Sequence, residues 1–297
     1  MKIETCVIGS YPVFPDTSVL MDGYFRQADT FSWEPWITTA VSDMVSAGID
    51  IVSDGQTRDP FIQLFTRKLN GCRVRDRTEI IGKIAYDGPI TVDDQLFVKS
   101  FLPKTAKLKG VLTGPFTLMR SCVDSYYSDE KQIAFDFAQA LHKEAEKVQG
   151  VVDMISIDEP FFSNELPDYA IELIGTITKN ISCPTVLHAC GDVSRIVSDF
   201  IDMPVDVLSH EFKASPQLFD AFKEFSSSKQ MCLGAVRSDD ARVEPVKEIV
   251  NHVQRGVDVF GDKLIQISPD CGQRLLPRKV AFDKLTNLVQ AGDIVNG

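Results

Sequence analysis

The sequence lacks an excess of positive charge and lacks long apolar runs. Its 297 residues contain 31 Lys and Arg against 42 Asp and Glu, which gives a formal net charge of −11 at pH 7. Nucleic acids and anionic membrane surfaces are bound by basic faces, so we expect neither as a partner. No stretch approaches the roughly 18 consecutive apolar residues that cross a bilayer, so we expect no membrane helix.

Low-complexity tracts, internal repeats and a disulfide framework are also missing. The seven cysteines are odd in number and widely spaced, unlike the dense frameworks of small secreted domains. The N-terminal residues, Met1 to Cys6, enter an apolar run without the pattern of a signal peptide. We therefore expect a reduced, cytoplasmic protein. At 297 residues, the chain can form one large α/β barrel or two ordinary domains.

What the sequence does contain is a regular alternation of short β-rich runs and helical stretches. We expect eight strands, over residues 5–10, 49–54, 108–115, 152–160, 185–190, 205–211, 230–236 and 264–271. Eight strands with helical crossovers predict an α/β fold, a parallel (β/α)8 TIM barrel that forms a single domain over residues 1–297. A doubly wound open sheet is the alternative.

One segment breaks this alternation. Residues 56–106 follow the second strand, and we expect them to form an insertion in the barrel. This insertion would contain a helical piece near 60–68 and then a small hairpin formed by 80–86 and 90–97. The third strand comes only after it. A long helix over about 129–149 follows that strand, and we expect Glu144 and Lys147 on its solvent face.

A possible metal site lies at the end of the fifth strand. The apolar run 185–187 leads into His188 and Cys190, with one residue between them, and Gly191 follows. Side chains two residues apart on a strand face the same side, so both could bind one ion. Two later apolar runs also stop at possible ligands, Glu211 and Cys271. Together these residues predict a four-ligand zinc site. The alternative for the pair is a buried histidine and a small hydrophobic residue.

Further polar residues gather at the C-terminal ends of the expected strands. In a closed barrel these ends meet at one mouth, where barrel active sites lie. The residues are Ser10, Asp54, Gln56, Thr113, Asp158, Glu159, Arg237 and Asp239. We therefore expect a catalytic site there. The alternative interpretation of Asp158 and Glu159 is an acidic pair at the start of a helix.

Six motifs stand in order along almost the whole chain. They are Ile8-Gly9-Ser10-Tyr11-Pro12, Leu112-Thr113-Gly114-Pro115, Ile157-Asp158-Glu159-Pro160, His188-Ala189-Cys190, Glu211 and Ser268-Pro269-Asp270-Cys271-Gly272. By these motifs the chain resembles the catalytic half of the cobalamin-independent methionine synthases. The resemblance is closest to the short, single-barrel core branch of archaea and some bacteria, which lacks the N-terminal barrel of the long enzymes.

The resemblance implies a methyltransferase that converts homocysteine to methionine and binds one Zn²⁺ per chain. The positions that match the zinc ligands are His188, Cys190, Glu211 and Cys271. The positions implied for substrate binding are Ile8, Gly9, Ser10, Gln56 and Asp158. Among them, Ser10 would act through its backbone and Asp158 as the counter-ion of the substrate ammonium.

The chemistry of such a ligand set agrees with thiol alkylation. A thiol with a pKa near 8.5 is mostly protonated at neutral pH, and only the thiolate is a good nucleophile. Zn²⁺ deprotonates a coordinated thiol. Two cysteine thiolates and one carboxylate already bring about three negative charges to the ion, which leaves a bound substrate sulfur electron-rich. Hydrolytic zinc sites more often have neutral histidines and an open water position.

Three positions depart from the long enzymes. Gln56 stands where they have a glutamate that binds the ammonium, Ser121 where they have a tryptophan packed against the folate, and Asp239 where they have a run with a proposed proton-donor histidine. A pterin amine leaves only when protonated and favours a stacking surface, whereas a corrinoid needs neither. We therefore expect methylcobalamin or a methylated corrinoid protein as donor and partner. A methyl-pterin of the folate type, with Asp239 as the acid, is the alternative.

Three other functions compete with this one. A methylcobamide:coenzyme M methyltransferase would use a similar zinc, but its substrate sulfonate needs an arginine, for which Arg237 is available unless it pairs with Asp239. A metal-free lyase of the uroporphyrinogen decarboxylase kind shares the fold, but it needs an arginine cluster and leaves the ligand residues unexplained. The third is a methyl-acceptor or zinc-sensing protein that is not an enzyme.

Overall fold

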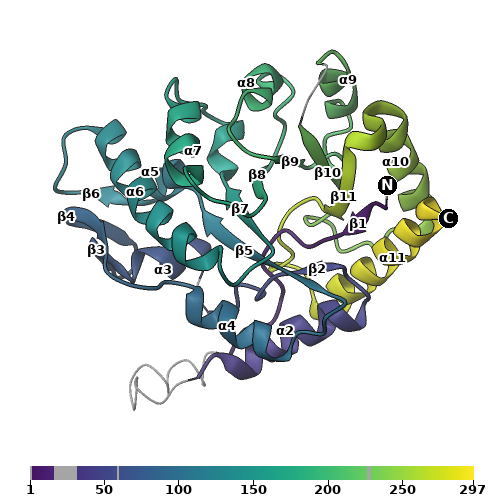
Figure 1. Ribbon diagram of the computed structural model, residues 1–297, viewed down its shortest axis with the longest axis horizontal. Coiled ribbons are helices and arrows are strands. Elements are labelled where there is room, and N and C mark those ends of the chain that lie inside the picture. Colours follow the sequence, from purple (N-terminus) through teal and green to yellow (C-terminus); the bar gives the residue numbers. More distant parts are fainter. Residues whose placement is uncertain (1, 17–31, 59, 226–228) are drawn as a thin grey trace.

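Eight parallel strands form the centre of the molecule (Figure 1). The computed structural model describes residues 2–16, 32–58, 60–225 and 229–297. Within these residues the strands are ordered β1-β11-β10-β9-β8-β7-β5-β2. Their bounds are Glu4–Thr5 (β1), Ile51–Val52 (β2), Lys107–Thr113 (β5), Met154–Asp158 (β7), Thr185–Ala189 (β8), Val207–His210 (β9), Gln230–Val236 (β10) and Leu264–Pro269 (β11).

A parallel bridge between Cys6 and Ile51 joins the two ends of this order, so that the sheet closes on itself. The predicted (β/α)8 barrel is thus confirmed, and the open sheet is excluded. Inside the barrel, a small apolar cluster fills the space between the strands; its buried members are Cys6, Ile51, Met154, Val186, Val207 and Cys232. A much larger core lies between the strands and the surrounding helices.

Helices cover the outside of the barrel (Figure 1). The α-helices are Glu34–Ser46 (α2), Phe61–Thr66 (α3), Val92–Phe101 (α4), Pro115–Ser121 (α5), Glu130–Val148 (α6), Ala170–Thr178 (α7), Val197–Ile201 (α8), Leu218–Lys223 (α9), Val246–Phe260 (α10) and Arg278–Asn296 (α11). Short 3-10 helices lie at Pro160–Ser163 (η2) and Gly261–Lys263 (η3). No helix in the described part of the chain is both long enough and apolar enough to span a membrane.

The first two strands are shorter than expected, because their later residues bond to each other's loops instead of to a neighbouring strand. Ser53 donates its hydroxyl to the Gly9 carbonyl at 2.6 Å, and the Tyr11 amide donates to the Gly55 carbonyl at 3.0 Å. These contacts turn residues 8–11 and 53–56 out of the ladder. Both segments consequently lie over the mouth of the barrel, next to the functional residues described below.

The segment after β2 contains a separate sheet. Strands β3 (Leu69–Val74) and β4 (Thr78–Tyr86) pair antiparallel, and β6 (Val123–Asp124) adds to β4 in parallel (Figure 1). Most of the expected hairpin partner, residues 90–97, lies instead in helix α4, which begins at Val92. The first apolar residues of this segment, Ile90 and Val92, alternate with other residues as they would in a strand. However, Asp93 and Asp94 in the first turn favour a helix N-terminus, and Val98 anchors the buried face.

Glu144 lies inside the molecule, so its expected position on the solvent face of α6 is wrong. Its side chain is fully buried and accepts hydrogen bonds from the backbone amides of Ile90 and Thr91 at 2.9 and 2.7 Å. The hydroxyls of Thr91 and Tyr86 also donate to it. One carboxylate thus holds the turn that leads into α4, because two amides there lack other partners. The expected exposure of Lys147 is confirmed.

We predict that Glu144→Ala lowers the free energy of unfolding by about 2–4 kcal/mol, because the substitution leaves several buried donors without an acceptor. Urea denaturation followed by circular dichroism measures the change. The matched control is Glu146→Ala, an exposed position on the same helix, for which we expect a change within about 0.5 kcal/mol. Equal effects of the two substitutions would contradict the role given to Glu144.

Candidate metal centre and substrate site

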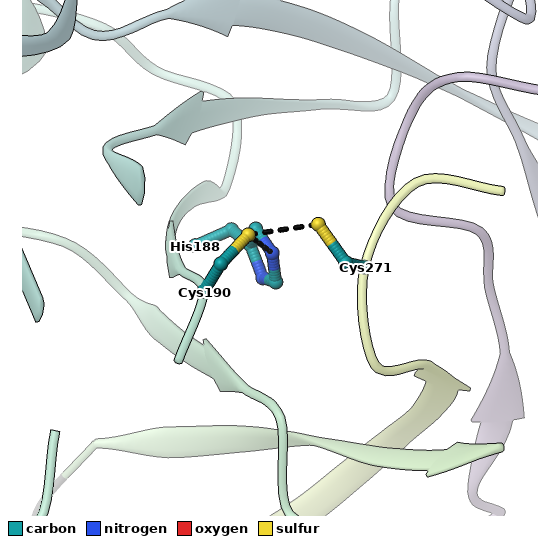
Figure 2. Close-up of side chains that lie close together, drawn as sticks. All are labelled: His188, Cys190 and Cys271. Atoms are coloured by element: carbon teal, nitrogen blue, oxygen red, sulfur yellow. Dashed lines mark hydrogen bonds between the residues drawn. The ribbon is translucent and has the colours of Figure 1, made fainter. Parts of the chain in front are cut away.

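Three ligand-bearing side chains meet at the mouth of the barrel. His188 lies on β8, Cys190 directly follows that strand, and Cys271 follows β11 (Figure 2). The Nε2 atom of His188 is 3.1 Å from the Cys190 sulfur, which is 2.8 Å from the Cys271 sulfur. All three ligand atoms lie within 4.8 Å of one another, so they could hold one metal ion. The structure therefore brings together three of the four predicted ligands.

The His188 ring has the protonation state that a metal ligand needs. The side chain is buried, and its Nδ1 shares a hydrogen bond with the Ser209 hydroxyl at 3.1 Å. Burial, aided by the nearby His210 and Lys109, lowers the pKa of His188 to about 3, so the ring is neutral at pH 7. Ser209 orients the ring and leaves Nε2 directed at the two sulfurs. Sequence reasoning missed Ser209, although it is the register partner of His188 on β9.

Glu211, the fourth predicted ligand, lies beside this group and not within it. It directly follows β9, is half-buried, and lies near Cys190, which affects its pKa. Burial raises the pKa of the Glu211 carboxyl. The pKa of the Cys190 thiol is raised as well, chiefly by its hydrogen bond with Cys271 and by burial. A cation at this point would reverse that direction, because it stabilises thiolates.

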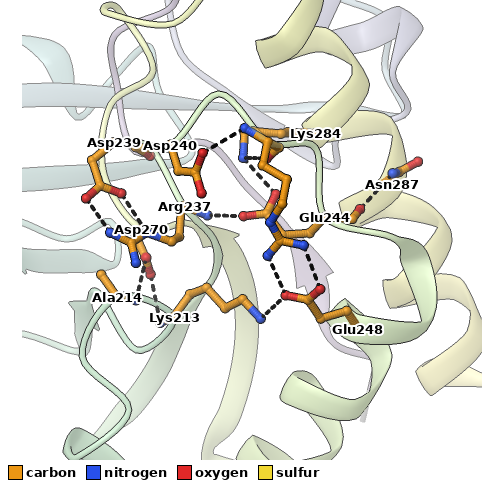
Figure 3. A network of polar contacts seen from close by, with 12 residues as sticks. Lys213, Ala214, Arg237, Asp239, Asp240, Glu244, Glu248, Asp270, Lys284 and Asn287 are labelled. Carbon is orange, nitrogen blue, oxygen red and sulfur yellow. Dashed lines mark hydrogen bonds and ion pairs between the residues drawn. The ribbon is translucent and has the colours of Figure 1, made fainter.

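Ser238 and Asp270 hold the loop that carries Cys271. The sequence analysis identified neither of them as a ligand or a support. The Ser238 hydroxyl donates to the Cys271 carbonyl at 2.7 Å and accepts from the Cys271 amide at 3.0 Å. Asp270, the preceding residue, accepts from the amides of Lys213 and Ala214 at 3.0 and 2.8 Å (Figure 3). Burial raises the pKa of Asp270 to about 8, against the effect of these amides. The only sequence signal was their position at strand ends.

The segment predicted to bind the amino-acid part of the substrate lies against Gln56. A Cβ atom on Gly9 would lie 2.8 Å from the Gln56 Oε1 atom, so the glycine lets the carboxamide reach the backbone of residues 8–10. Gln56 has a φ of 45°, in the left-handed region that residues with a side chain rarely adopt. Asp54 accepts from its amide at 2.9 Å, which helps to hold this conformation.

The loop after Cys271 also contacts both parts of this segment. The Gln273 amide donates to the Ser10 carbonyl at 2.8 Å, and Arg274 donates to the Gln56 carbonyl at 2.8 Å. The candidate metal ligand Cys271 is therefore connected, through three successive residues, to two of the predicted substrate-binding positions. Sequence reasoning missed Gln273 and Arg274, since nothing in a sequence indicates contacts across the barrel.

Asp158 ends β7 and is the direct register partner of His188 on β8. It accepts a hydrogen bond from the Ser156 hydroxyl at 2.8 Å. Enclosure in the barrel raises the pKa of Asp158 to about 6, and the charge of Lys109 acts in the opposite direction. Lys109 is itself buried in β5 and donates to the Val7 carbonyl, just before the Ile8 segment. Asp158 is thus a carboxylate next to the candidate metal ligand His188, with the buried Lys109 as a nearby positive charge.

Glu159 has a structural role at the start of a helix. The alternative interpretation of Asp158 and Glu159 as an acidic pair at a helix start therefore applies to Glu159 alone. Its buried carboxylate accepts from the amides of Phe116 and Thr117, both at 2.9 Å, at the N-terminus of α5. That helix follows the neighbouring strand, and not β7 itself. Gly114 leaves room for the carboxylate, because a Cβ atom there would lie 2.1 Å from its Cδ.

Arg237 and Asp239 form an ion pair on the loop after β10 (Figure 3). Two hydrogen bonds of 2.7 and 2.5 Å join them. The Arg237 guanidinium holds the pKa of Asp239 below its usual range, so this largely exposed carboxylate is ionised at neutral pH. Glu244 holds this loop in place. It accepts a hydrogen bond from the Arg237 amide at 2.8 Å and forms a fully buried ion pair with Lys284.

Known proteins resemble the chain over its whole length. Residues 3–293 match the family described as the cobalamin-independent synthase catalytic domain. A protein named methionine synthase from Methanocaldococcus jannaschii is 34% identical, over 98% of this chain and 99% of its own length. Another of that name from Methanothermobacter marburgensis is 35% identical, over 97% and 98%.

A solved structure shares the fold. It is described as a B12-independent methionine synthase from Shewanella sp. W3-18-1 in complex with selenomethionine, and it superimposes with a TM-score of 0.82 at 23% identity. The match covers 99% of this chain and 98% of that one. At this level of identity the comparison supports the barrel architecture.

The methyl donor expected from the sequence is wrong. The matched family is by its description cobalamin-independent, which overturns methylcobalamin as donor and a corrinoid protein as partner. That expectation depended on three single positions, Gln56, Ser121 and Asp239. A stacking surface or a proton source can come from other parts of the chain, so the loss of one residue at each position does not identify the donor.

We predict that Gly114→Ala destabilises the protein by about 1–3 kcal/mol, because the new methyl group would overlap the buried Glu159 carboxylate. The backbone at Gly114 is extended, with a φ of −65°, so the effect would be steric alone. The control is Gly150→Ala, where the nearest atom would lie 3.9 Å away. Thermal unfolding of both variants measures the difference, and a similar stability of the two would refute this explanation.

Proposed function

The chain belongs to the family of the cobalamin-independent synthases, and from this premise we propose that it transfers a methyl group to the thiol of homocysteine to form methionine. The resemblance seen in the sequence motifs is thereby confirmed. The observation that carries the proposal is the convergence of His188, Cys190 and Cys271 within 4.8 Å. They converge at the barrel mouth that also holds Asp158 and the Ile8–Ser10 backbone.

We propose Zn²⁺ as the ion for this group, with Glu211 as a fourth ligand. The donor set is one neutral imidazole and two thiols, and soft sulfur ligands favour zinc over Mg²⁺ or Ca²⁺. When bound, the ion would keep the substrate sulfur as a thiolate, which is the nucleophilic form. The half-buried position of Glu211 beside Cys190 supports its inclusion, because a short side-chain movement would bring its carboxylate to the same point.

We propose that Asp158 and the backbone of residues 8–10 bind the amino-acid end of homocysteine. Asp158 is charged at neutral pH, since its pKa is about 6, and it would pair with the substrate ammonium. The Gln56 carboxamide, adjacent to Gly9, would add a neutral hydrogen-bonding group. Together these groups distinguish an amino-acid thiol from a simple thiol.

For the donor we propose the remaining alternative, a methyl-pterin of the folate type. Its leaving nitrogen must be protonated, and a general acid works best when its pKa is near the working pH. Asp239 is ionised in its pair with Arg237, so in this arrangement it is a poor acid. We therefore assign Asp239 the role of holding Arg237 and do not assign it the proton transfer.

The same ion pair weighs against coenzyme M as the substrate. A sulfonate would need a guanidinium free to bind it, and Arg237 already makes two hydrogen bonds to Asp239. A metal-free lyase would not need the three metal-ligand atoms that converge here, so this function is disfavoured. A zinc-sensing protein that is not an enzyme has no use for Asp158 and Gln56 next to that group.

We predict one tightly bound zinc per chain, and Cys271→Ser should lose it or bind it much more weakly, because one of the converging ligands is removed. Metal analysis of the purified proteins measures zinc content, and circular dichroism checks that the barrel is folded. The control is Cys183→Ser, the same change at a half-buried cysteine outside the group. A wild type without zinc, or full zinc content in Cys271→Ser, would reject the assignment.

We predict that Asp158→Asn raises the KM for homocysteine by about 10- to 150-fold, the equivalent of roughly 1.5–3 kcal/mol for a charge-assisted contact. Zinc content should stay the same. The control substrate is 4-mercaptobutyrate, which is homocysteine without its amino group, and its KM should hardly change. If the KM rises equally for both substrates, Asp158 does not bind the ammonium.

A further inference from the structure

Asp270 connects two of the loops that carry the proposed zinc ligands. It is covalently joined to Cys271 on the β11 side. Its two carboxylate oxygens accept from the amides of Lys213 and Ala214, at 3.0 and 2.8 Å, in the turn that begins at Glu211 (Figure 3). The Asp270 side chain is 2% exposed, so water does not compete for these hydrogen bonds.

The strand between these two loops is built to admit the carboxylate. Gly234 lies on β10, which pairs with β9 on one side and β11 on the other. A Cβ atom there would be 2.2 Å from the Asp270 Oδ1 atom and 2.7 Å from the His210 carbonyl oxygen. Any other residue at this position would push Asp270 away from the turn. The absence of a side chain therefore lets one carboxylate reach across a whole strand.

We propose that Asp270 is a positioning residue that places Glu211 for metal binding. The inference rests on the proposed zinc site. Three ligand atoms already lie within 4.8 Å of one another, and Glu211 is the ligand outside that group. The backbone turn that carries Glu211 is bonded through Lys213 and Ala214 to the residue next to Cys271, so the two ligands keep a fixed separation. Groups that orient metal ligands typically contribute 10- to 100-fold to metal affinity.

The test is the zinc dissociation constant of Asp270→Asn, measured by competition with a chromogenic chelator. Asparagine has the same shape, but its NH2 group would face one of the two backbone amides, donor against donor. We expect zinc binding to weaken by about 10- to 100-fold while all four ligand side chains remain. If the variant fails to fold, Asp270→Glu keeps the carboxyl group but displaces it by one methylene, and we expect weakening in the same direction.

Glu144→Gln is the matched control. Glu144 is also a buried carboxylate that accepts from two successive backbone amides, those of Ile90 and Thr91, but it lies on α6, away from the ligand loops. Both substitutions should lower the unfolding temperature of the metal-free protein. Only Asp270→Asn should weaken zinc binding, and Glu144→Gln should change the dissociation constant by less than about threefold.

A double-mutant cycle with Glu211→Ala tests the route of the effect. If Asp270 acts through Glu211, adding Asp270→Asn to Glu211→Ala should weaken zinc binding by less than about threefold more. Equal zinc affinity of Asp270→Asn and wild type, or additive losses in the cycle, would overturn the inference. A wild type that binds no zinc would instead overturn the proposed site itself, so the two failures are distinguishable.

Discussion

Parallel pairing around a closed barrel is the constraint on which the site depends. Because all eight strands run in one direction, their C-terminal ends meet at one mouth. The register then sets the level of each side chain: Asp158 is the partner of His188, and His188 is the partner of Ser209. A shift of one residue in any of these pairs would turn the side chain to the outside of the barrel. The proposed counter-ion, the metal ligand and the hydroxyl that orients it are therefore neighbours by virtue of the sheet alone.

Hydrogen bonds to loops fix the parts of the structure that strand pairing does not, and three of them are of the same kind. Glu144, Glu159 and Asp270 are buried carboxylates, and each accepts from two successive backbone amides. Amides at the start of a helix or in a turn have no partner within their own segment, and an unpaired buried amide costs about 1–3 kcal/mol. Each carboxylate consequently fixes a loop to an element that is distant in the sequence. Around the proposed metal centre, rigidity of this kind matters because ligand geometry must be held closely.

The sequence was sufficient for the fold and for the convergence of His188, Cys190 and Cys271, because both follow from periodicity and from where apolar runs stop. It was not sufficient for helix α4, whose first apolar residues alternate as in a strand, or for Glu144, whose burial depends on donors from another segment. Ser238 and Asp270 were also missed as supports, since their roles come from contacts between loops. The methyl donor was wrong for a related reason: Gln56, Ser121 and Asp239 were judged one at a time, whereas a donor site is made by many residues together.

The distribution of the ligands has a further physical consequence. Cys190 follows β8 and Cys271 follows β11, and two strands, β9 and β10, lie between them in the sheet. An ion bound to both would add a direct link between these strand ends, beside the ladder and the Asp270 hydrogen bonds to the turn after β9. Since binding to the folded state alone stabilises it, the ion would raise the stability of this arc of the barrel. The Gln273 and Arg274 contacts to Ser10 and Gln56 continue the connection to β1 and β2. Metal binding and closure of the barrel mouth are thus favoured by the same contacts.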